Sequence, residues 1–229
     1  MTYIMSDLHG EYKLFASLMK KIHFSTKDRL YICGDVIEKG PQSVKLLKKL
    51  LSLPNVYIIR GNHEDAFIQY YHSLMAETDD FDLVLSKLRE YIHGDGHLLD
   101  WETVDAIENL PYYIETDSFI CVHAGLTLTE DGSLPKLSEA RIEDMLYNRR
   151  FKSPDVLPRA GKCVFYGHTS TTGVNAEGGI LTYIREGSDP HDFSSYIKVH
   201  LDMGSFVTGR VGCFCIDNCQ CYYVNKSET

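Results

Sequence analysis

The chain has 229 residues, of which 44% are hydrophobic, and its formal net charge is -9. This length and composition suffice for a sizeable core, and we expect one domain over residues 1–229. The acidic balance argues against a nucleic-acid-binding protein, and no run of about 18 apolar residues predicts a membrane span. Seven cysteines, an odd number, and a start without a signal-peptide pattern favour a cytoplasmic protein.

Two short apolar runs near the N-terminus each end in a turn that carries potential metal ligands. Tyr3 to Met5 is followed by Asp7 and His9, which project to the same side of an extended backbone because they are two residues apart. Leu30 to Cys33 is followed by a Gly-Asp turn that contains Asp35, whose carboxylate could bridge two cations. The alternative is structural, with Asp7 capping a helix and Asp35 forming an Asx turn.

A third apolar run, Val56 to Ile59, ends in the stretch Arg60-Gly61-Asn62-His63-Glu64. Open α/β sheets bind ligands just beyond the carboxyl ends of their strands, so this turn is well placed for chemistry. Arg60 can clamp two phosphate oxygens, Asn62 offers a neutral oxygen to a metal, and His63 can transfer a proton. Taken alone, a polar turn after a strand is usually only a turn.

Two later predicted strands end in histidine. Phe119 to Val122 precedes His123, and Cys163 to Tyr166 precedes Gly167-His168. A mixed set of carboxylate, amide and imidazole ligands suits two divalent cations such as Mn²⁺, Fe or Zn²⁺. Two such ions could hold a bridging hydroxide for in-line attack at phosphorus. The full candidate set is Asp7, His9, Asp35, Asn62, His123 and His168.

Apolar periodicity predicts the remaining elements. We expect the acidic stretch from Glu77 to Asp82 to be a solvated loop, and the chain from about Ile180 to form β-strands. The predicted helices are Tyr12 to Ile22, Pro41 to about Leu51, Glu64 to Met75, Leu83 to Ile92 and Trp101 to Leu110.

Four cysteines near the C-terminus suggest a zinc site, but their spacing argues against one. A turn at Asp217-Asn218 would pair two strands so that Cys213 and Cys215 face one side of the sheet. Cys219 and Cys221 would then face the other side. Thiolates on two faces cannot form one tetrahedral site, so we expect these residues to pack as small hydrophobic side chains.

Five sequence blocks resemble, in their order along the chain, the phosphoprotein phosphatase branch of the calcineurin-like metallophosphoesterases. The compact size resembles that of bacterial and phage-type members, and Tyr147-Asn148-Arg149 and Leu201–Ser205 add weaker similarity. The five blocks are Ser6-Asp7-Leu8-His9-Gly10, Gly34-Asp35-Val36-Ile37-Glu38-Lys39-Gly40, Arg60-Gly61-Asn62-His63-Glu64, His123-Ala124-Gly125 and Gly167-His168-Thr169.

The resemblance implies an α/β fold (α+β in some schemes) with a central β-sandwich flanked by helices in four layers, αββα. It implies that Asp7, His9 and Asp35 hold one metal ion, and that Asp35, Asn62, His123 and His168 hold the second. His63 would be the general acid. Arg60 and Arg149 would clamp the substrate phosphate, with Arg150 as the alternative to Arg149.

Two departures from the family pattern stand beside the implied acid. Glu38 occupies the position of an Asp that supports the acid histidine, and it can still stabilise protonated His63. Lys39 replaces a phosphate-binding Arg, so it keeps the charge but loses the bidentate geometry. We therefore expect an active enzyme with a possible shift in its substrate range.

The resemblance favours a serine/threonine protein phosphatase with two divalent ions, Mn²⁺ first among them, acting on a phosphoprotein or a small phosphoester. The alternative is a symmetrical dinucleoside polyphosphate (Ap4A-type) hydrolase, and a weaker one is a non-catalytic metal-binding module. A nuclease is disfavoured, because Ser170 stands where nucleases of the superfamily commonly carry a second histidine. We expect no nucleic-acid or membrane partner, and the sequence gives no indication of the oligomeric state.

Overall fold

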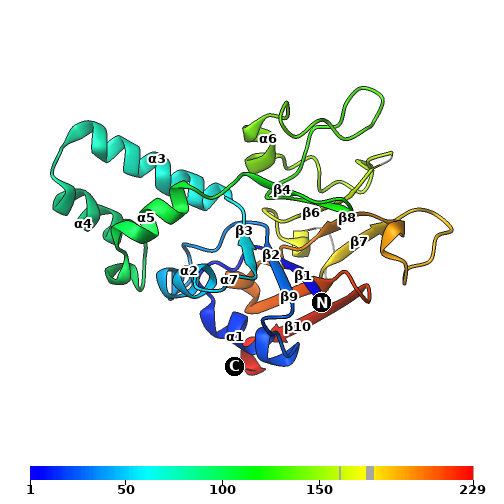
Figure 1. Ribbon diagram of the computed structural model, residues 1–229, viewed down its shortest axis with the longest axis horizontal. Coiled ribbons are helices and arrows are strands. Elements are labelled where there is room, and N and C mark those ends of the chain that lie inside the picture. The colour runs from blue at the N-terminus through cyan, green and yellow to red at the C-terminus, as the bar shows by residue number, and fades with distance from the viewer. Residues whose placement is uncertain (160, 174–177, 229) are drawn as a thin grey trace.

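The fold contains ten described strands in two sheets. The computed structural model describes residues 1–159, 161–173 and 178–228 (Figure 1). The bounds of the strands are β1 Thr2–Met5, β2 Arg29–Ile32, β3 Val56–Ile58, β4 Tyr113–Glu115, β5 Phe119–Val122, β6 Cys163–Tyr166, β7 Leu181–Ile184, β8 Tyr196–His200, β9 Arg210–Cys215 and β10 Gln220–Asn225. They form two sheets, sheet A with the order β10-β9-β1-β2-β3 and sheet B with the order β4-β5-β6-β8-β7.

Helices lie mainly beside sheet A and in a lobe at one side of the molecule (Figure 1). The α-helices are α1 Tyr12–Lys21, α2 Ser43–Leu51, α3 Asn62–Glu77, α4 Phe81–Tyr91, α5 Trp101–Glu108, α6 Ile142–Tyr147 and α7 Ser205–Thr208. Short 3₁₀ turns are η1 Gly96–Leu98, η2 Thr171–Gly173, η3 Phe193–Ser195 and η4 Lys226–Glu228. In the part of the chain that the structure describes, no helix has the length and apolar character to cross a membrane.

The two sheets pack face to face around an apolar core. β1, β2 and β3 are parallel, and so are β5, β6 and β8, whereas β9, β10, β4 and β7 add antiparallel strands. Alternate side chains of both sheets meet between them, including Ile4, Ile59, Phe165, Val199 and Phe214. The carboxyl ends of parallel strands in each sheet lie at one edge, which is where a ligand site is expected.

The outer faces of the sheets are covered differently. Sheet A packs against apolar side chains of α1 and α2, and the same core continues into the lobe formed by α3, α4 and α5. Sheet B packs against a segment between β5 and β6 in which α6 is short, with Leu126, Leu137, Met145 and Phe151 buried on Val164. The expected sandwich flanked by helices is therefore present, with a largely irregular layer on sheet B.

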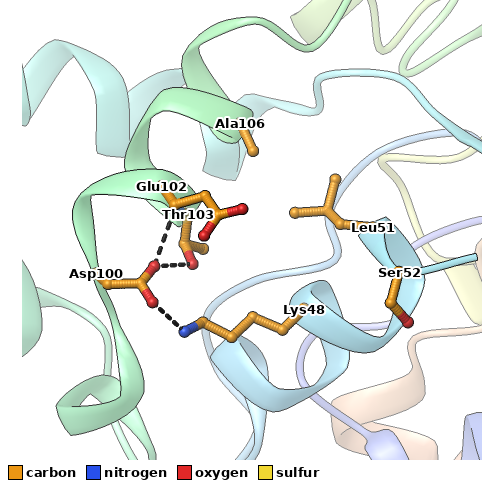
Figure 2. A pocket seen from close by; sticks show the side chains of 7 residues that line it. All are labelled: Lys48, Leu51, Ser52, Asp100, Glu102, Thr103 and Ala106. Carbon is orange, nitrogen blue, oxygen red and sulfur yellow. Dashed lines mark hydrogen bonds and ion pairs between the residues drawn. The ribbon is translucent and has the colours of Figure 1, made fainter.

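Polar contacts join the lobe to α2. The Lys48 ammonium on α2 pairs with the Asp100 carboxylate at the start of α5, as Figure 2 shows. The same carboxylate caps α5, because it accepts hydrogen bonds from the Thr103 backbone N–H (3.0 Å) and hydroxyl (2.6 Å). One side chain thus begins a helix and attaches it to its neighbour.

Most predicted elements are present, with differences at their ends. α3 begins at Asn62 instead of Glu64, and α2 begins at Ser43 instead of Pro41. The acidic stretch predicted as a loop contains the start of α4, because the Asp80 carboxylate accepts a hydrogen bond from the Leu83 N–H at 3.0 Å and caps the helix. The short α6 was missed, because six residues give too little periodicity.

The predicted register of the C-terminal hairpin is confirmed. Cys215 pairs with Gln220, and Cys221 pairs with Phe214. Cys213 and Cys215 face the helix side of sheet A, whereas Cys219 and Cys221 pack in the core between the sheets. The four thiols therefore lie on two faces, as the sequence predicts.

Candidate metal centre and active site

The six predicted metal ligands lie where the carboxyl ends of β1, β2, β3, β5 and β6 meet. Sheet A contributes Asp7, His9, Asp35 and Asn62 through the turns after β1, β2 and β3, and sheet B contributes His123 and His168. Two groups of side chains, each with ligand atoms within 4.8 Å of one another, contain Asp35: one with His9 and His63, the other with Asp7 and His123.

Asp35 lies at the centre of the cluster and is almost fully buried. Its Oδ2 atom is 3.7 Å from His9 Nε2, 3.4 Å from His123 Nε2 and 3.9 Å from His63 Nε2. Burial raises the pKa of Asp35, but the neighbouring imidazoles of His123, His63 and His9 and a hydrogen bond from the His63 backbone N–H outweigh burial and lower it. An ionised carboxylate shared by two groups of donors has the geometry for a bridging ligand.

The histidine tautomers test whether a cation fits here. His123 Nδ1 lies 2.8 Å from the Cys33 carbonyl, to which it donates, so in the neutral ring Nε2 carries the lone pair. That lone pair faces the Asn62 Oδ1 oxygen at 2.9 Å, and Asp35 lies beyond. Acceptors that face one another in a buried site repel unless a cation lies between them, so this donor set fits a metal ion.

His9 and His168 are held in the same neutral state. His9 Nδ1 donates to the Ile37 carbonyl at 3.2 Å, and burial lowers the pKa of this imidazole to about 4. Burial, followed by the neighbouring His123, lowers the pKa of His168 to about 4 as well. His168 Nδ1 lies 2.7 Å from Asn62 Oδ1. Neutral imidazoles are the form that binds metal ions.

The turns that carry the ligands are strongly bent and pinned by one carboxylate. Glu64 is fully buried, and its side chain accepts N–H groups of Asp35 (2.9 Å), Val36 (2.8 Å), Ile37 (3.0 Å) and Gly61 (2.9 Å). Left-handed backbone conformations, with φ between 42° and 72°, occur at Asp7, His9, Asp35, Glu38, Lys39 and His168. Such conformations are strained for non-glycine residues and persist only where the surroundings fix them.

His63 lies next to the metal cluster and hydrogen-bonds through Nδ1 to the Glu38 carboxylate. Burial lowers the pKa of His63, but the Glu38 hydrogen bond and the charges of Asp35 and Glu38 outweigh it, so the pKa is raised. Glu38 therefore reaches His63 in spite of its extra methylene. Lys39 Nζ lies 3.1 Å from Nε2 of His9, whose ring is itself edge-on to the His63 ring.

Arg60 is buried beside the cluster, and most of its donors already have partners. Its terminal nitrogens bind the Asp65 carboxylate (3.3 Å), the Tyr112 hydroxyl (3.0 Å) and the carbonyls of Ile107 and Glu108. Of the N–H groups of the Arg60 side chain, the Nε–H is the one for which the described residues offer no acceptor. The predicted phosphate clamp would have to form through this nitrogen.

Arg149 and Arg150 differ in their surroundings. Both are exposed, but the charge of Arg149 acts on His168, whereas Arg150 lines a separate hollow with Phe151 and Asn148. Tyr147, the first residue of the same block, has its ring edge-on to His168, with 6.2 Å between ring centroids. The geometry therefore favours Arg149 over Arg150 as the residue nearer to the substrate.

Sequence reasoning missed three side chains at this site. The anchoring role of Glu64 has a signal in hindsight, since a glutamate at the third position of a helix commonly caps it. Buried Asp202 follows β8, and burial raises its pKa to about 6. Tyr112, which binds both Arg60 and Asp65, follows a proline between a helix and a strand and has no motif of its own.

Comparison with known proteins identifies the family. The model of the calcineurin-like phosphoesterase family matches residues 2–198. The chain belongs to the calcineurin-like phosphoesterase family. The two groups of candidate ligands that share Asp35 agree with the dinuclear divalent metal centre expected of this family.

Two curated relatives carry the same name. A symmetrical bis(5'-nucleosyl)-tetraphosphatase of Buchnera aphidicola subsp. Acyrthosiphon pisum is 31% identical over 154 residues, which cover 66% of this chain and 53% of the relative. One of Coxiella burnetii is 34% identical over 128 residues, which cover 55% of this chain and 42% of the relative. The matches thus span about half the length of these relatives.

Solved structures support the family fold. A candidate diadenosine tetraphosphatase is similar with a TM-score of 0.69 at 18% identity, over 98% of this chain and 92% of that chain. A cold-active protein-tyrosine phosphatase of a psychrophilic Shewanella species gives a TM-score of 0.59 at 14% identity, over 100% of this chain and 78% of that chain. At these identities the likeness concerns the fold alone.

Proposed function

We propose that the protein hydrolyses dinucleoside polyphosphates symmetrically, so that water and diadenosine tetraphosphate yield two molecules of ADP. The observation that carries this proposal is the 31% identity to a symmetrical bis(5'-nucleosyl)-tetraphosphatase over 66% of this chain. It corrects the order of the two expectations from the sequence: the serine/threonine protein phosphatase came first there, and the curated relatives favour the alternative.

The resemblance divides the candidate ligands into two sets that share Asp35, whereas by distance alone Asp7 groups with Asp35 and His123, and His9 groups with Asp35 and His63. Asp7 and His9 would complete the first set, and Asn62, His123 and His168 would complete the second, as the resemblance implies. When bound, two divalent ions would neutralise charge on the phosphoryl oxygens and supply a nucleophile at neutral pH. The residues themselves hold neutral imidazoles and one ionised carboxylate in place before any ion arrives.

His63 would donate a proton to the leaving oxygen. The raised pKa of His63, with Glu38 at Nδ1, favours the protonated imidazole and leaves Nε2 toward Asp35 and the cluster. General acid catalysis contributes about 10²–10⁴-fold for poor leaving groups. The leaving phosphate of an anhydride is a weaker base than an alkoxide, so His63 should matter less for diadenosine tetraphosphate than for a phosphoserine ester.

Lys39 and Arg149 would bind the polyphosphate chain. In the described structure Lys39 donates to His9 Nε2. Because one lone pair cannot serve both a lysine and a metal ion, a metal on His9 would release the Lys39 ammonium to the substrate. Arg149 is exposed beside His168, whereas the terminal nitrogens of Arg60 already have protein partners.

The decisive experiment measures hydrolysis by metal-stripped protein re-supplied with Mn²⁺. The substrates are diadenosine tetraphosphate, a phosphothreonine peptide and a phosphotyrosine peptide, with products separated by chromatography. We expect preference for the dinucleotide, with ADP as the single nucleotide product. Preference for the phosphothreonine peptide would contradict this proposal and support the protein phosphatase function instead.

Two variants and one control test the residue roles in the same assay. Asp35→Asn should reduce bound metal and lower kcat more than about 100-fold, since changes around ligands already cost 10–100-fold. His63→Asn should lower kcat with metal content unchanged. His97→Asn replaces an exposed histidine of η1 and should behave as the wild type. Full activity of Asp35→Asn would contradict the shared-ligand assignment.

A further inference from the structure

A pocket of about 370 Å³ lies between α3 and α6, and we name it the α3–α6 pocket. Its walls come from both helices and from the stretches after β3 and α5. The lining residues used below are Arg60, Asp65, Ile68, Tyr112, Leu146 and Tyr147.

The α3–α6 pocket adjoins the metal cluster. The Tyr147 ring lines the pocket and is also edge-on to His168, at 6.2 Å between centroids and an interplanar angle of 88°. On the other wall, Arg60 and Asp65 flank the helix start that carries Asn62. A substrate whose phosphate lies at the cluster could therefore extend directly into this pocket.

The walls of the pocket suit a flat aromatic ring. Tyr147 is 46% exposed, so its face is available for stacking, whereas Ile68 and Leu146 are buried and provide an apolar base. Tyr112 holds a fixed position, because its hydroxyl bonds both Arg60 and Asp65 and the Arg60 guanidinium carbon lies 4.9 Å from its ring centroid. Bases stack on such aromatic side chains in many nucleotide sites.

One buried donor of an arginine that lines the pocket lacks an acceptor among the described residues. Arg60 is 7% exposed, and its Nε–H has no hydrogen-bond partner among the residues that the structure describes. Since buried donors are nearly always satisfied, this N–H calls for an acceptor from a ligand. A nucleoside presents such acceptors on its ring nitrogens and ribose oxygens, whereas a phenol ring carries none within the ring.

We propose that the α3–α6 pocket binds a nucleoside of the dinucleoside polyphosphate, with the base stacked on Tyr147 and an acceptor on Arg60 Nε–H. This inference rests on the proposed function for the identity of the substrate. The pocket then acts as a specificity site, since it holds the part of the substrate that does not react. The occupant that competes with it is the tyrosine ring of a phosphopeptide.

Binding of AMP, compared with inorganic phosphate, tests the pocket without catalysis. Calorimetric titration of the Mn²⁺-loaded wild type should show tighter binding of AMP than of phosphate. Tyr147→Ala should weaken AMP binding about tenfold, as expected for a lost stacking partner, and at least five times more than it weakens phosphate binding. Tyr147→Phe keeps the ring and should restore AMP binding.

Turnover supplies the second readout. The kcat/KM of Tyr147→Ala should fall about ten times further for diadenosine tetraphosphate than for inorganic tetraphosphate, which has the same phosphate chain without nucleosides. Phe81→Ala removes an exposed aromatic side chain on α4 and serves as the control. Circular dichroism of each variant checks that the fold is retained.

The outcomes separate the pocket from the proposed function. If the wild type hydrolyses the dinucleotide but Tyr147→Ala lowers kcat/KM equally for both substrates, the nucleoside site is contradicted and the proposed function is retained. If AMP binding depends on Tyr147 but the protein does not hydrolyse the dinucleotide, the nucleoside site is supported and the proposed hydrolase function is contradicted. If Tyr147→Ala loses phosphotyrosine-peptide turnover but keeps AMP binding, the pocket binds the aromatic side chain of a peptide, and the proposal of a nucleoside site is wrong.

Discussion

The two walls of the metal site are held by buried charges of opposite sign. On the sheet A wall, the Glu64 carboxylate accepts four backbone N–H groups at 2.8–3.0 Å. On the sheet B wall, the Lys198 ammonium donates to the carbonyls of Phe151, Ser153 and Val156 at 2.7–2.8 Å. Both side chains have no exposed surface.

The difference reflects what each wall must hold. The turns after β2 and β3 direct their N–H groups inward while they aim Asp35 and Asn62 at the metal cluster, so an anion is the matching anchor. The layer on sheet B turns carbonyls inward, and Lys198 fixes it without touching a candidate ligand. The same device therefore positions ligands on one wall and only supports the fold on the other.

The largest effect is expected from Glu64→Gln. An amide has one acceptor oxygen, and its NH₂ group would face N–H donors, so several charge-assisted hydrogen bonds are lost at once. We expect the free energy of unfolding to fall by about 4 kcal/mol or more. Because the bonds anchor both sides of Asp35, metal content measured by mass spectrometry should fall as well.

A matched glutamate separates this effect from a general loss of surface charge. Glu139→Gln changes an exposed residue that pairs with Lys136 at the surface, and it should leave both stability and metal content unchanged. Retention of full metal content in a destabilised Glu64→Gln would show that the turn geometry does not depend on its anchor.

A smaller effect, confined to the fold, is expected from Lys198→Met. Methionine fills a similar volume but removes three hydrogen bonds, and only the Ser153 carbonyl keeps a donor among the described residues, the Val156 N–H, so the loss should cost about 3 kcal/mol. Denaturant unfolding measures this loss. Metal content should stay at the wild-type level, and a drop in metal binding would remove the distinction between the two walls.

The smallest effect concerns the contact between the lobe and α2 in Figure 2. Asp100→Ala removes the cap of α5 and should cost about 1 kcal/mol, whereas Asp100→Asn keeps the cap and loses only the pair with Lys48. Hydrogen bonds from Lys48 and Thr103 lower the pKa of Asp100 to about 2. The stabilisation is thus present above the unfolded-state pKa near 4 and is lost as pH falls from about 4 to 2.

Thermal unfolding between pH 2 and pH 6 checks this sign. The difference in unfolding temperature between the wild type and Asp100→Ala should disappear in the acidic part of that range. A constant difference across the range would show that the carboxylate of Asp100 does not titrate with the fold.

The rule that ligands gather at strand ends was enough to assemble most of the site. Asp35, Asn62 and His123 are far apart in sequence, yet each follows a strand. His123 Nε2 lies 2.9 Å from Asn62 Oδ1 and 3.4 Å from Asp35 Oδ2. The assignment of roles to these residues stays a prediction. Their proximity is what strand order and parallel direction dictate.

Features without periodicity or a fixed register could not be predicted from the sequence. Tyr147 was noted only for its resemblance to a family block, because a six-residue helix in an irregular layer gives no pattern from which a pocket follows. Arg60 was expected to face a phosphate, and nothing local in the sequence shows that Tyr112 and Asp65 occupy its terminal nitrogens. Contacts between side chains distant in sequence decide such cases.

The left-handed backbone at Asp7, His9, Asp35, Glu38, Lys39 and His168 has a consequence for engineering. Each such residue raises the energy of the folded chain by roughly 1 kcal/mol relative to glycine, which adopts this conformation without strain. A sequence selected for thermal stability alone would drift toward glycine or asparagine there. Activity and heat resistance therefore compete at these positions, and stabilising substitutions are better sought outside the turns that carry the ligands.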